Sequence, residues 1–254
     1  MRAALNRALR WGLVERNAAA LADPPRIEAK PIQPLTADQV RQFLDAVAAD
    51  PLGPLFQVAI ATGMRQRELF GLRWEDVDLT AATVTVRVAL QNVGGTKTFV
   101  EPKTPHSRRT IPLPASGVRA LRAQHARQNG QRLAAGSRWQ EWGLVFTARY
   151  GTPLDGSNVG ARLKKALQAA DLPRQRFHDL RHCSASLLLQ GGVGMRTIMG
   201  RLGHSQISLT MNTYTHLSPE LERDAADALD RMIERPKPEG KHATRTDQAT
   251  QDLG

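Results

Sequence analysis

The stretch HDLRH at residues 178–182 places two histidines four residues apart, with an arginine between them. On a helix, His178 and His182 would share one face, which is how the zinc proteases present two metal ligands. The zinc motif has glutamate as its general base, whereas this stretch has Asp179, and Arg181 would place a permanent cation beside the metal. Because a third ligand is not evident either, the sequence disfavours a metallohydrolase.

Other reactive side chains change the interpretation of this stretch. They are Arg65 in TGMRQREL, Lys103 in PKTPHSRRTIPL, and His204 and Tyr214 in LGHSQISLTMNTYTH. Taken singly, each of them is more readily a core or surface residue than a reactive one. Taken with HDLRH they form a set of two arginines, two histidines, one lysine and one tyrosine, without an acidic cluster for Mg²⁺.

This set fits phosphoryl transfer without a metal ion. A phosphodiester under attack gathers negative charge on its non-bridging oxygens, which two arginines can hold through forked hydrogen bonds. Tyrosine can act as a covalent nucleophile if nearby cations lower its pKa from the ordinary value of about 10. Histidine can donate to the phosphate or accept the phenol proton. Lysine on a hairpin can protonate the leaving 5′ oxygen.

With these motifs in this order, the sequence resembles the catalytic domain of the tyrosine recombinases, the phage-integrase family, over residues 36–234. The resemblance implies a site-specific DNA recombinase or integrase that cleaves and rejoins DNA through a 3′-phosphotyrosyl link. It also implies strand exchange through a Holliday junction, and no metal or nucleotide cofactor. The implied partner is double-stranded DNA, on which the chain would assemble as a homo-oligomer, a tetramer.

The resemblance assigns a role to individual residues. The catalytic residues it implies are Arg65, Lys103, His178, Arg181, His204 and Tyr214, with Tyr214 as the nucleophile and Glu68 as an acidic support. Lys97 is an alternative to Lys103, but only Lys103 lies in the expected turn. The alternative function is a catalytically incomplete, DNA-binding remnant of an integrase. It stays open because only the last helix of the family's N-terminal DNA-clamping domain has a counterpart here.

The elements that must position these residues are mainly helical. TADQ predicts a capping box with Thr36 as N-cap, and the helix through LFQVAIAT should stop at Gly63. RQRELFGLRW should resume as helix. Further helices are predicted at about 114–132, 156–170, 179–190, 194–202, 208–214 and 218–234, with a polar loop at 132–143.

The predicted strands are few. Strict alternation predicts one strand at 83–90, and residues 96–114 should form two short strands around a turn at 102–107. These would make one small antiparallel sheet with a long hairpin. The predicted fold class is therefore mainly α with a small antiparallel β-sheet (α+β), as the resemblance to the tyrosine recombinase catalytic domain also implies.

The domain organisation follows from composition and from the resemblance. Residues 1–21 look like the last helix of a core-binding domain, and the proline-rich stretch 22–35 is a linker. The catalytic domain should cover 36–234, and the polar stretch 235–254 should be a disordered tail.

Composition favours one class of binding partner and one cellular compartment. The net charge of +11 favours a polyanionic partner, nucleic acid before membrane. Cys183 is the single cysteine, which excludes an internal disulfide and fits a reducing cytoplasm. Since no apolar run approaches the roughly 18 residues of a membrane span, we expect a cytoplasmic protein without a membrane partner.

Overall fold

The computed structural model describes residues 1–22, 33–101 and 108–203. Contacts divide the chain into two units, Met1–Gln33 and Pro34–Gly254, which are described separately. The first unit contains helices α1 (Arg2–Arg10) and α2 (Ala18–Leu21). The Arg2 side chain joins them, since its Nε donates to Ala19 O at 3.1 Å. The helices predicted at 208–214 and 218–234, the tail, and most of the predicted linker lie outside the described residues.

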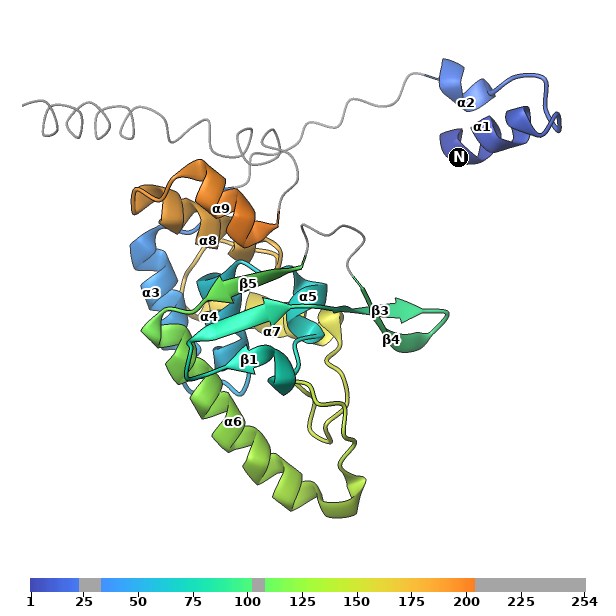
Figure 1. The fold of residues 1–254 in the computed structure, drawn as a ribbon. Helices are drawn as coiled ribbons and strands as arrows, with labels where there is room; N and C mark the ends of the chain where they lie inside the picture. The colour runs from blue at the N-terminus through green and yellow to red at the C-terminus, as the bar shows by residue number, and fades with distance from the viewer. Residues whose placement is uncertain (23–32, 102–107, 204–254) are drawn as a thin grey trace, which may run out of the picture. The chain divides into compact units, whose positions relative to one another are not determined.

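Helices are the main elements in the described part of the second unit, as predicted (Figure 1). They are α3 (Ala37–Ala46), α4 (Gly53–Thr62), α5 (Gln66–Phe70), α6 (Ala115–Ala135), α7 (Gly156–Ala169), α8 (Asp179–Gln190) and α9 (Met195–Leu202). Two short 3-10 helices, η1 (Trp74–Asp76) and η3 (Gly136–Arg138), follow α5 and α6. The polar loop predicted from residue 132 therefore begins later than expected, because α6 and η3 occupy its first residues.

The second unit begins with a capped helix anchored to the core. Thr36 Oγ1 accepts the Gln39 backbone N–H at 3.2 Å, and Gln39 Oε1 accepts the Thr36 N–H at 3.0 Å. This confirms the predicted capping box. Leu35, the preceding residue, is buried, and its N–H donates to the sulfur of Cys183 on α8 at 3.4 Å. Burial raises the pKa of the Cys183 thiol to about 11, so this sulfur is a core group.

The predicted strand pairing is wrong. The alternating stretch 83–90 is two strands, β2 (Thr83–Val86) and the start of β3 (Ala89–Val93). Strand β3 pairs with β4 (Thr96–Val100), and β2 pairs with both β1 (Val77–Asp78) and β5 (Arg109–Pro112). The two strands on either side of 102–107 thus belong to different sheets, a three-stranded sheet β1-β2-β5 and a two-stranded one.

A tight turn explains the two-stranded sheet. Gly94 and Gly95 join β3 to β4, and both have positive φ, 57° and 87°. A two-residue turn of this kind matches the twist of antiparallel strands and favours glycine at both positions. The fold class is nevertheless the predicted one, mainly α with small antiparallel sheets.

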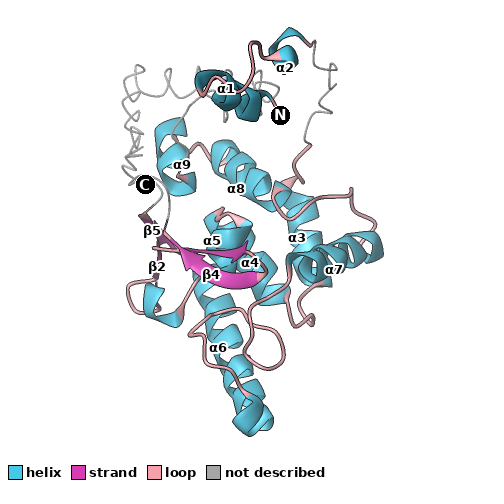
Figure 2. Cartoon of the chain, turned by 90° about the vertical axis from the view of Figure 1, so that its right-hand side faces the viewer, coloured by secondary structure: helices cyan, strands magenta, loops and turns pink. Residues whose placement is uncertain are grey.

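Helix α4 lies at the centre of the second unit and is buried on most of its surface, including Leu55, Phe56 and Val58. It contacts α3, α6 and α8. Figures 1 and 2 show α8 and α9 on one side of the β2-β5 sheet, with α6 extending away on the opposite side. Helix α9 contacts β5, so the end of α9 and the inner face of β5 meet beside α4 and α5. In the described part of the chain, no helix has the length and apolar character needed to cross a membrane.

Candidate active site

The start of helix α5 holds the first predicted arginine together with its acidic neighbour. Gly63 ends α4 in the left-handed conformation (φ 63°), after which Arg65 is the N-cap of α5. The Glu68 carboxylate accepts the Arg65 backbone N–H at 2.9 Å and its Nη1 at 2.8 Å. A carboxylate is favoured at a helix N-terminus, so this local fold holds both side chains in place.

The second predicted arginine, Arg181, is buried on helix α8. Its Nη1 donates to Gly63 O at 2.7 Å, and its Nη2 donates to Leu202 O at 2.6 Å. Both carbonyls lie at helix C-termini, where backbone acceptors lack partners within the helix. Arg181 therefore joins the ends of α4 and α9.

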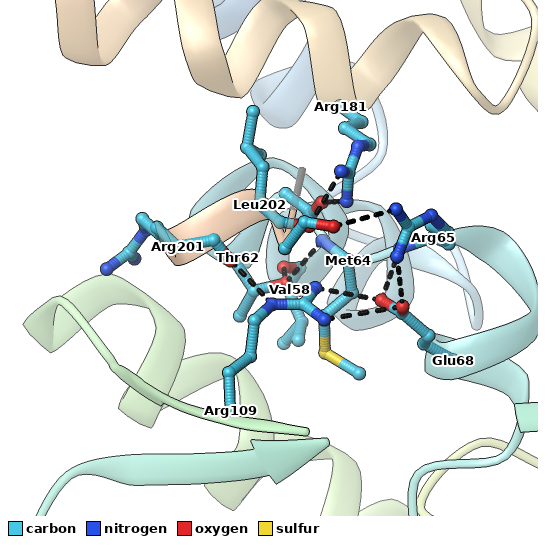
Figure 3. A network of polar contacts seen from close by, with 11 residues as sticks. Val58, Thr62, Met64, Arg65, Glu68, Arg109, Arg181, Arg201 and Leu202 are labelled. Carbon is cyan, nitrogen blue, oxygen red and sulfur yellow. Dashed lines mark hydrogen bonds and ion pairs between the residues drawn. The ribbon is translucent and has the colours of Figure 1, made fainter. Parts of the chain in front are cut away.

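Three consecutive carbonyls at the end of α9 each accept a hydrogen bond from an arginine of another element. They pair as Arg201 O with Arg109 Nε at 2.6 Å, Leu202 O with Arg181 Nη2 at 2.6 Å, and Gly203 O with Arg65 Nη2 at 3.0 Å. In Figure 3, the guanidinium groups of Arg65, Arg109 and Arg181 point toward this end of the helix. The partial negative charge of a helix C-terminus favours such cations. The cluster ends one residue before His204 in the sequence.

Two arginines share the buried carboxylate of Glu68. Arg109 Nη2 lies 2.8 Å from Oε2 and Nη1 lies 3.3 Å from Oε1, while Arg65 approaches from the other side (Figure 3). Burial alone would raise the pKa of Glu68. The hydrogen bonds and charge of Arg109, and then those of Arg65, outweigh it and hold the pKa below its ordinary value. Glu68 is therefore ionised at neutral pH.

His178 lies at the N-cap of α8. Partial burial of its imidazole, and then the positive charge of Arg181, lower its pKa. Arg65 contributes in the same direction, so both predicted arginines act on this ring. The ring of His182 packs edge-on at 5.3 Å between centroids, and burial followed by the charge of His178 lowers its pKa as well. A neutral imidazole near pH 7 can accept a proton.

Asp179, the acidic residue of HDLRH, is hydrogen-bonded to Arg176 at the start of helix α8. Asp179 accepts the Arg176 backbone N–H at 2.7 Å and its Nη2 at 3.0 Å. Burial alone would raise the pKa of Asp179, but the hydrogen bonds and charge of Arg176 hold it below the ordinary value. Among residues 1–22, 33–101 and 108–203, no three His, Cys, Asp or Glu side chains are grouped so that they could hold a metal ion.

The structure brings four of the predicted site residues together. Arg65 and Arg181 bind adjacent carbonyls, Glu68 binds Arg65, and His178 lies within reach of both arginine charges. The other three, Lys103, His204 and Tyr214, lie outside the described residues. The alternative lysine, Lys97, lies on β4 opposite Asn92 of β3.

Two arginines of this cluster were not predicted. Arg109 is buried on β5, and Arg201 on α9 donates from Nη2 to Ala61 O at 2.6 Å. Burial, and then the charge of Arg109, lower the pKa of Arg201. A signal for Arg109 exists in the sequence: on a strand it alternates in phase with Ile111, which is fully buried. An arginine in phase with core residues is expected to be buried and paired.

Sequence comparison assigns the chain to a family. Residues 33–220 match the profile of the phage integrase family. The chain belongs to this family. It is 35% identical over 214 residues to a protein named tyrosine recombinase XerC-like from Caldanaerobacter subterraneus, a match covering 80% of this chain and 55% of the relative. It is 32% identical over 249 residues to an integrase of Streptomyces ambofaciens, covering 91% of this chain and 62% of that protein. The chain thus spans less than two thirds of the length of either relative.

Solved structures of the integrase family share the fold. The Tn1549 transposon integrase, solved with circular intermediate DNA, superposes with a TM-score of 0.69 at 23% identity, covering 90% of this chain and 76% of that one. The XerA recombinase superposes with a TM-score of 0.62 at 22% identity, covering 84% of this chain and 68% of that one. The fold predicted from the resemblance, that of the tyrosine recombinase catalytic domain, is confirmed.

Proposed function

We propose that this chain cleaves and rejoins double-stranded DNA as a site-specific tyrosine recombinase, with Tyr214 as the nucleophile. One observation carries the proposal. Arg65 and Arg181 come from different helices and converge on the adjacent carbonyls of Gly203 and Leu202. Two guanidinium groups held this close can grip the two non-bridging oxygens of one phosphodiester.

The reaction proceeds in two balanced steps. The Tyr214 oxygen attacks the scissile phosphorus, the bond from phosphorus to the 5′ oxygen breaks, and a 3′-phosphotyrosyl link forms. A neutral His178 or His204 takes the phenol proton, and Lys103 gives a proton to the leaving 5′ oxygen. A 5′ hydroxyl of a second strand then attacks the link and gives its proton to the now neutral Lys103, and the tyrosine oxygen leaves with the proton that the histidine holds. Phosphodiester bonds are conserved in number, so the reaction needs no nucleotide.

The role of Arg181 follows from its surroundings. A backbone carbonyl fixes a guanidinium without cancelling its charge, whereas a carboxylate would neutralise it. Arg181 is anchored through Gly63 O and Leu202 O. It would stabilise the charge that develops on the phosphate, the task that metal ions perform at many phosphoryl-transfer sites.

The wider assignments are part of the same proposal. Residues 36–234 would be the catalytic domain, 1–21 the end of a core-binding domain, 22–35 a linker and 235–254 a tail. Binding of duplex DNA is supported by related structures solved with DNA, including a lambda integrase dimer bound to a core site. Assembly as a tetramer on paired sites, in the cytoplasm, follows from the family resemblance.

A selection from random duplexes tests the proposed activity and identifies the target sequence at the same time. The purified chain is incubated in excess EDTA with a library of random duplexes, and DNA that stays attached after denaturation with detergent is recovered and sequenced. We expect a recurring sequence, and a nicked substrate built on it should trap a covalent adduct. DNA binding without any adduct would favour the alternative, a DNA-binding remnant. An adduct that forms only with added Mg²⁺ or Zn²⁺ would contradict the metal-free mechanism.

A further inference from the structure

Arg109 and Arg65 bind the same carboxylate, that of Glu68, and each also binds its own carbonyl at the end of α9. Arg65 holds Glu68 Oε1 and Gly203 O, while Arg109 holds both oxygens of Glu68 and the carbonyl of Arg201. The Arg65 side chain is 39% exposed, whereas that of Arg109 is 7% exposed. Arg65 can therefore reach a phosphate at the surface, and Arg109 contacts the groups that position it.

The packing around Arg109 leaves little room for movement. Gly203 has φ 67°, and a Cβ atom added there would lie 3.0 Å from Arg109 Nη1 and 3.3 Å from its Cζ. Glycine at this position thus allows the end of α9 to lie against the guanidinium plane. The close contact fixes both Arg109 and the carbonyl that Arg65 binds.

Charge gives Arg109 a second role. Glu68 is 5% exposed and ionised, and alone it would cancel the charge that Arg65 presents to a phosphate. With Arg109 bound to the same carboxylate, the three groups carry a net charge of one positive unit. Little of this charge is screened by solvent, since Glu68 and Arg109 are both buried.

We propose that Arg109 is a positioning residue for DNA cleavage, which neutralises Glu68 so that the charge of Arg65 acts on the scissile phosphate. This inference rests on the proposed function. It is distinct from a purely structural role, in which Arg109 would only hold β5 against α9. The two roles differ in their response to the charge of the substrate.

The test measures single-turnover adduct formation on two versions of one nicked substrate. In the first, the scissile group is the natural phosphodiester. In the second, it is a methylphosphonate, in which a methyl group replaces one charged oxygen. For Arg109→Met we expect a loss of about 10²-fold on the phosphodiester, comparable with removal of one preorganised donor. On the neutral methylphosphonate the loss should be several-fold smaller. Arg109→Lys, which keeps a charge but not the fork, should lie between the wild type and Arg109→Met.

Two further variants separate charge from stability. In Glu68→Gln/Arg109→Met no buried carboxylate remains to be neutralised, so the double variant should cleave faster than Arg109→Met alone. Arg73→Met is the matched control, because Arg73 also pairs with a buried carboxylate, that of Asp76, at 3.2 Å. It lies outside the arginine cluster, and we expect it to lower the melting temperature without slowing adduct formation once DNA is bound.

The outcomes are distinguishable. If the wild type forms no adduct, the proposed function itself fails. If the wild type reacts but Arg109→Met reacts equally fast, or is slowed equally on both substrates, the inference is overturned. If Arg109→Met does not fold, Arg109→Lys and the double variant decide. A folded Arg109→Lys variant slowed equally on the phosphodiester and on the methylphosphonate, or a folded double variant that forms no adduct, would overturn the inference.

Discussion

At the scale of single residues, the candidate site is a group of arginines held by backbone carbonyls and by one shared carboxylate. Helix C-terminal carbonyls hold Arg181 and one side of Arg65, and the buried carboxylate of Glu68, which binds Arg65, also binds Arg109. The sequence motifs named Arg65, Glu68 and Arg181, which the structure brings together, and their catalytic roles stay a prediction. Arg109 was not predicted because it lies outside the motifs used, and its pairing with Glu68, 41 residues away, is evident only in the folded structure. A contact of that kind exists only after the sheet and α5 have come together.

The hairpin lysine allows a chemical test of its own. The 5′ oxygen leaves as a poor alkoxide unless it is protonated, so loss of the general acid in Lys103→Ala should slow cleavage by about 10²–10⁴-fold. A substrate with sulfur at the 5′ bridging position expels a thiolate, which needs no proton, and should restore nearly wild-type rates. Arg181→Ala should not be rescued, since its task is to hold the non-bridging oxygens. Rescue of Lys97→Ala by sulfur, and not of Lys103→Ala, would show that the acid is misassigned.

The paired histidines should make the protein less stable in mild acid. The folded state lowers the pKa of both His178 and His182, so below the ordinary histidine pKa of about 6.5 the unfolded chain binds protons that the folded chain does not. The free energy of unfolding should therefore fall as pH decreases below this value, measured by urea titration at a series of pH values. Replacing both histidines by asparagine should flatten this slope.

The same titration contains an internal control. Glu68 and Asp179 have lowered pKa values, so their contribution is present above the ordinary carboxyl pKa of about 4 and is lost as pH falls through the lower folded-state values. The histidine substitutions should leave the Glu68 contribution unchanged and weaken only that of Asp179, because the charge of His182 helps to lower the Asp179 pKa. An unchanged slope near pH 6 in the double asparagine variant would contradict the assignment to these rings.

At the scale of elements, the local sequence was enough to predict helix ends, whereas the strand pairing was predicted wrongly. The Thr36 capping box and the end of α4 at Gly63 depend on residues within one turn, so both could be predicted. The strand partners depend on the division of the stretch 83–90 into β2 and β3. The alternation of apolar residues does not show where β2 ends. The pair Gly94–Gly95 is the local signal for the β3-β4 hairpin, and the predicted pairing did not include it.

Gly63 lies where three helices meet, and its replacement should be costly. A Cβ atom there would lie 2.5 Å from the Leu202 Cδ2 atom, and the backbone is left-handed as well. Gly192 is the matched control, since it also has positive φ, 75°, but its added Cβ meets nothing within 4 Å.

Gly192→Ala should therefore cost only the backbone term, about 1–2 kcal/mol. Gly63→Ala should cost more than this by about 1–3 kcal/mol, because the inserted methyl forces neighbours apart, and it should also displace the carbonyl that anchors Arg181. Chemical denaturation measures both variants. Equal losses of stability would show that the helix junction yields without cost.

At the scale of the whole molecule, stability resides in the second unit. Its main hydrophobic core draws residues from Leu35 to Cys183, and α1 contributes no buried residue. Removing residues 1–33 should therefore leave the unfolding transition of the second unit unchanged in midpoint and in denaturant slope.

Leu35 is the first residue of this core, and its replacement should destabilise the protein, unlike the removal of residues 1–33. Leu35→Ala should lower the free energy of unfolding by about 2–5 kcal/mol, as expected for a buried leucine. Leu133→Ala, at an 84% exposed position on α6, should change it by less than about 0.5 kcal/mol. A large loss of stability on removal of residues 1–33 would contradict the division of the chain.

The central claim is that one tyrosine side chain becomes covalently joined to DNA. The most direct measurement traps the adduct on a nicked substrate, digests the protein, and locates the attached nucleotide by mass spectrometry, with Tyr214→Phe and Tyr150→Phe in parallel. These are the two tyrosines of the chain, and Tyr150 is the matched control. The account predicts a nucleotide on Tyr214, no adduct in Tyr214→Phe with DNA binding kept within a few-fold, and full activity in Tyr150→Phe. An adduct that persists in Tyr214→Phe, or a nucleotide attached to any other residue, would contradict it.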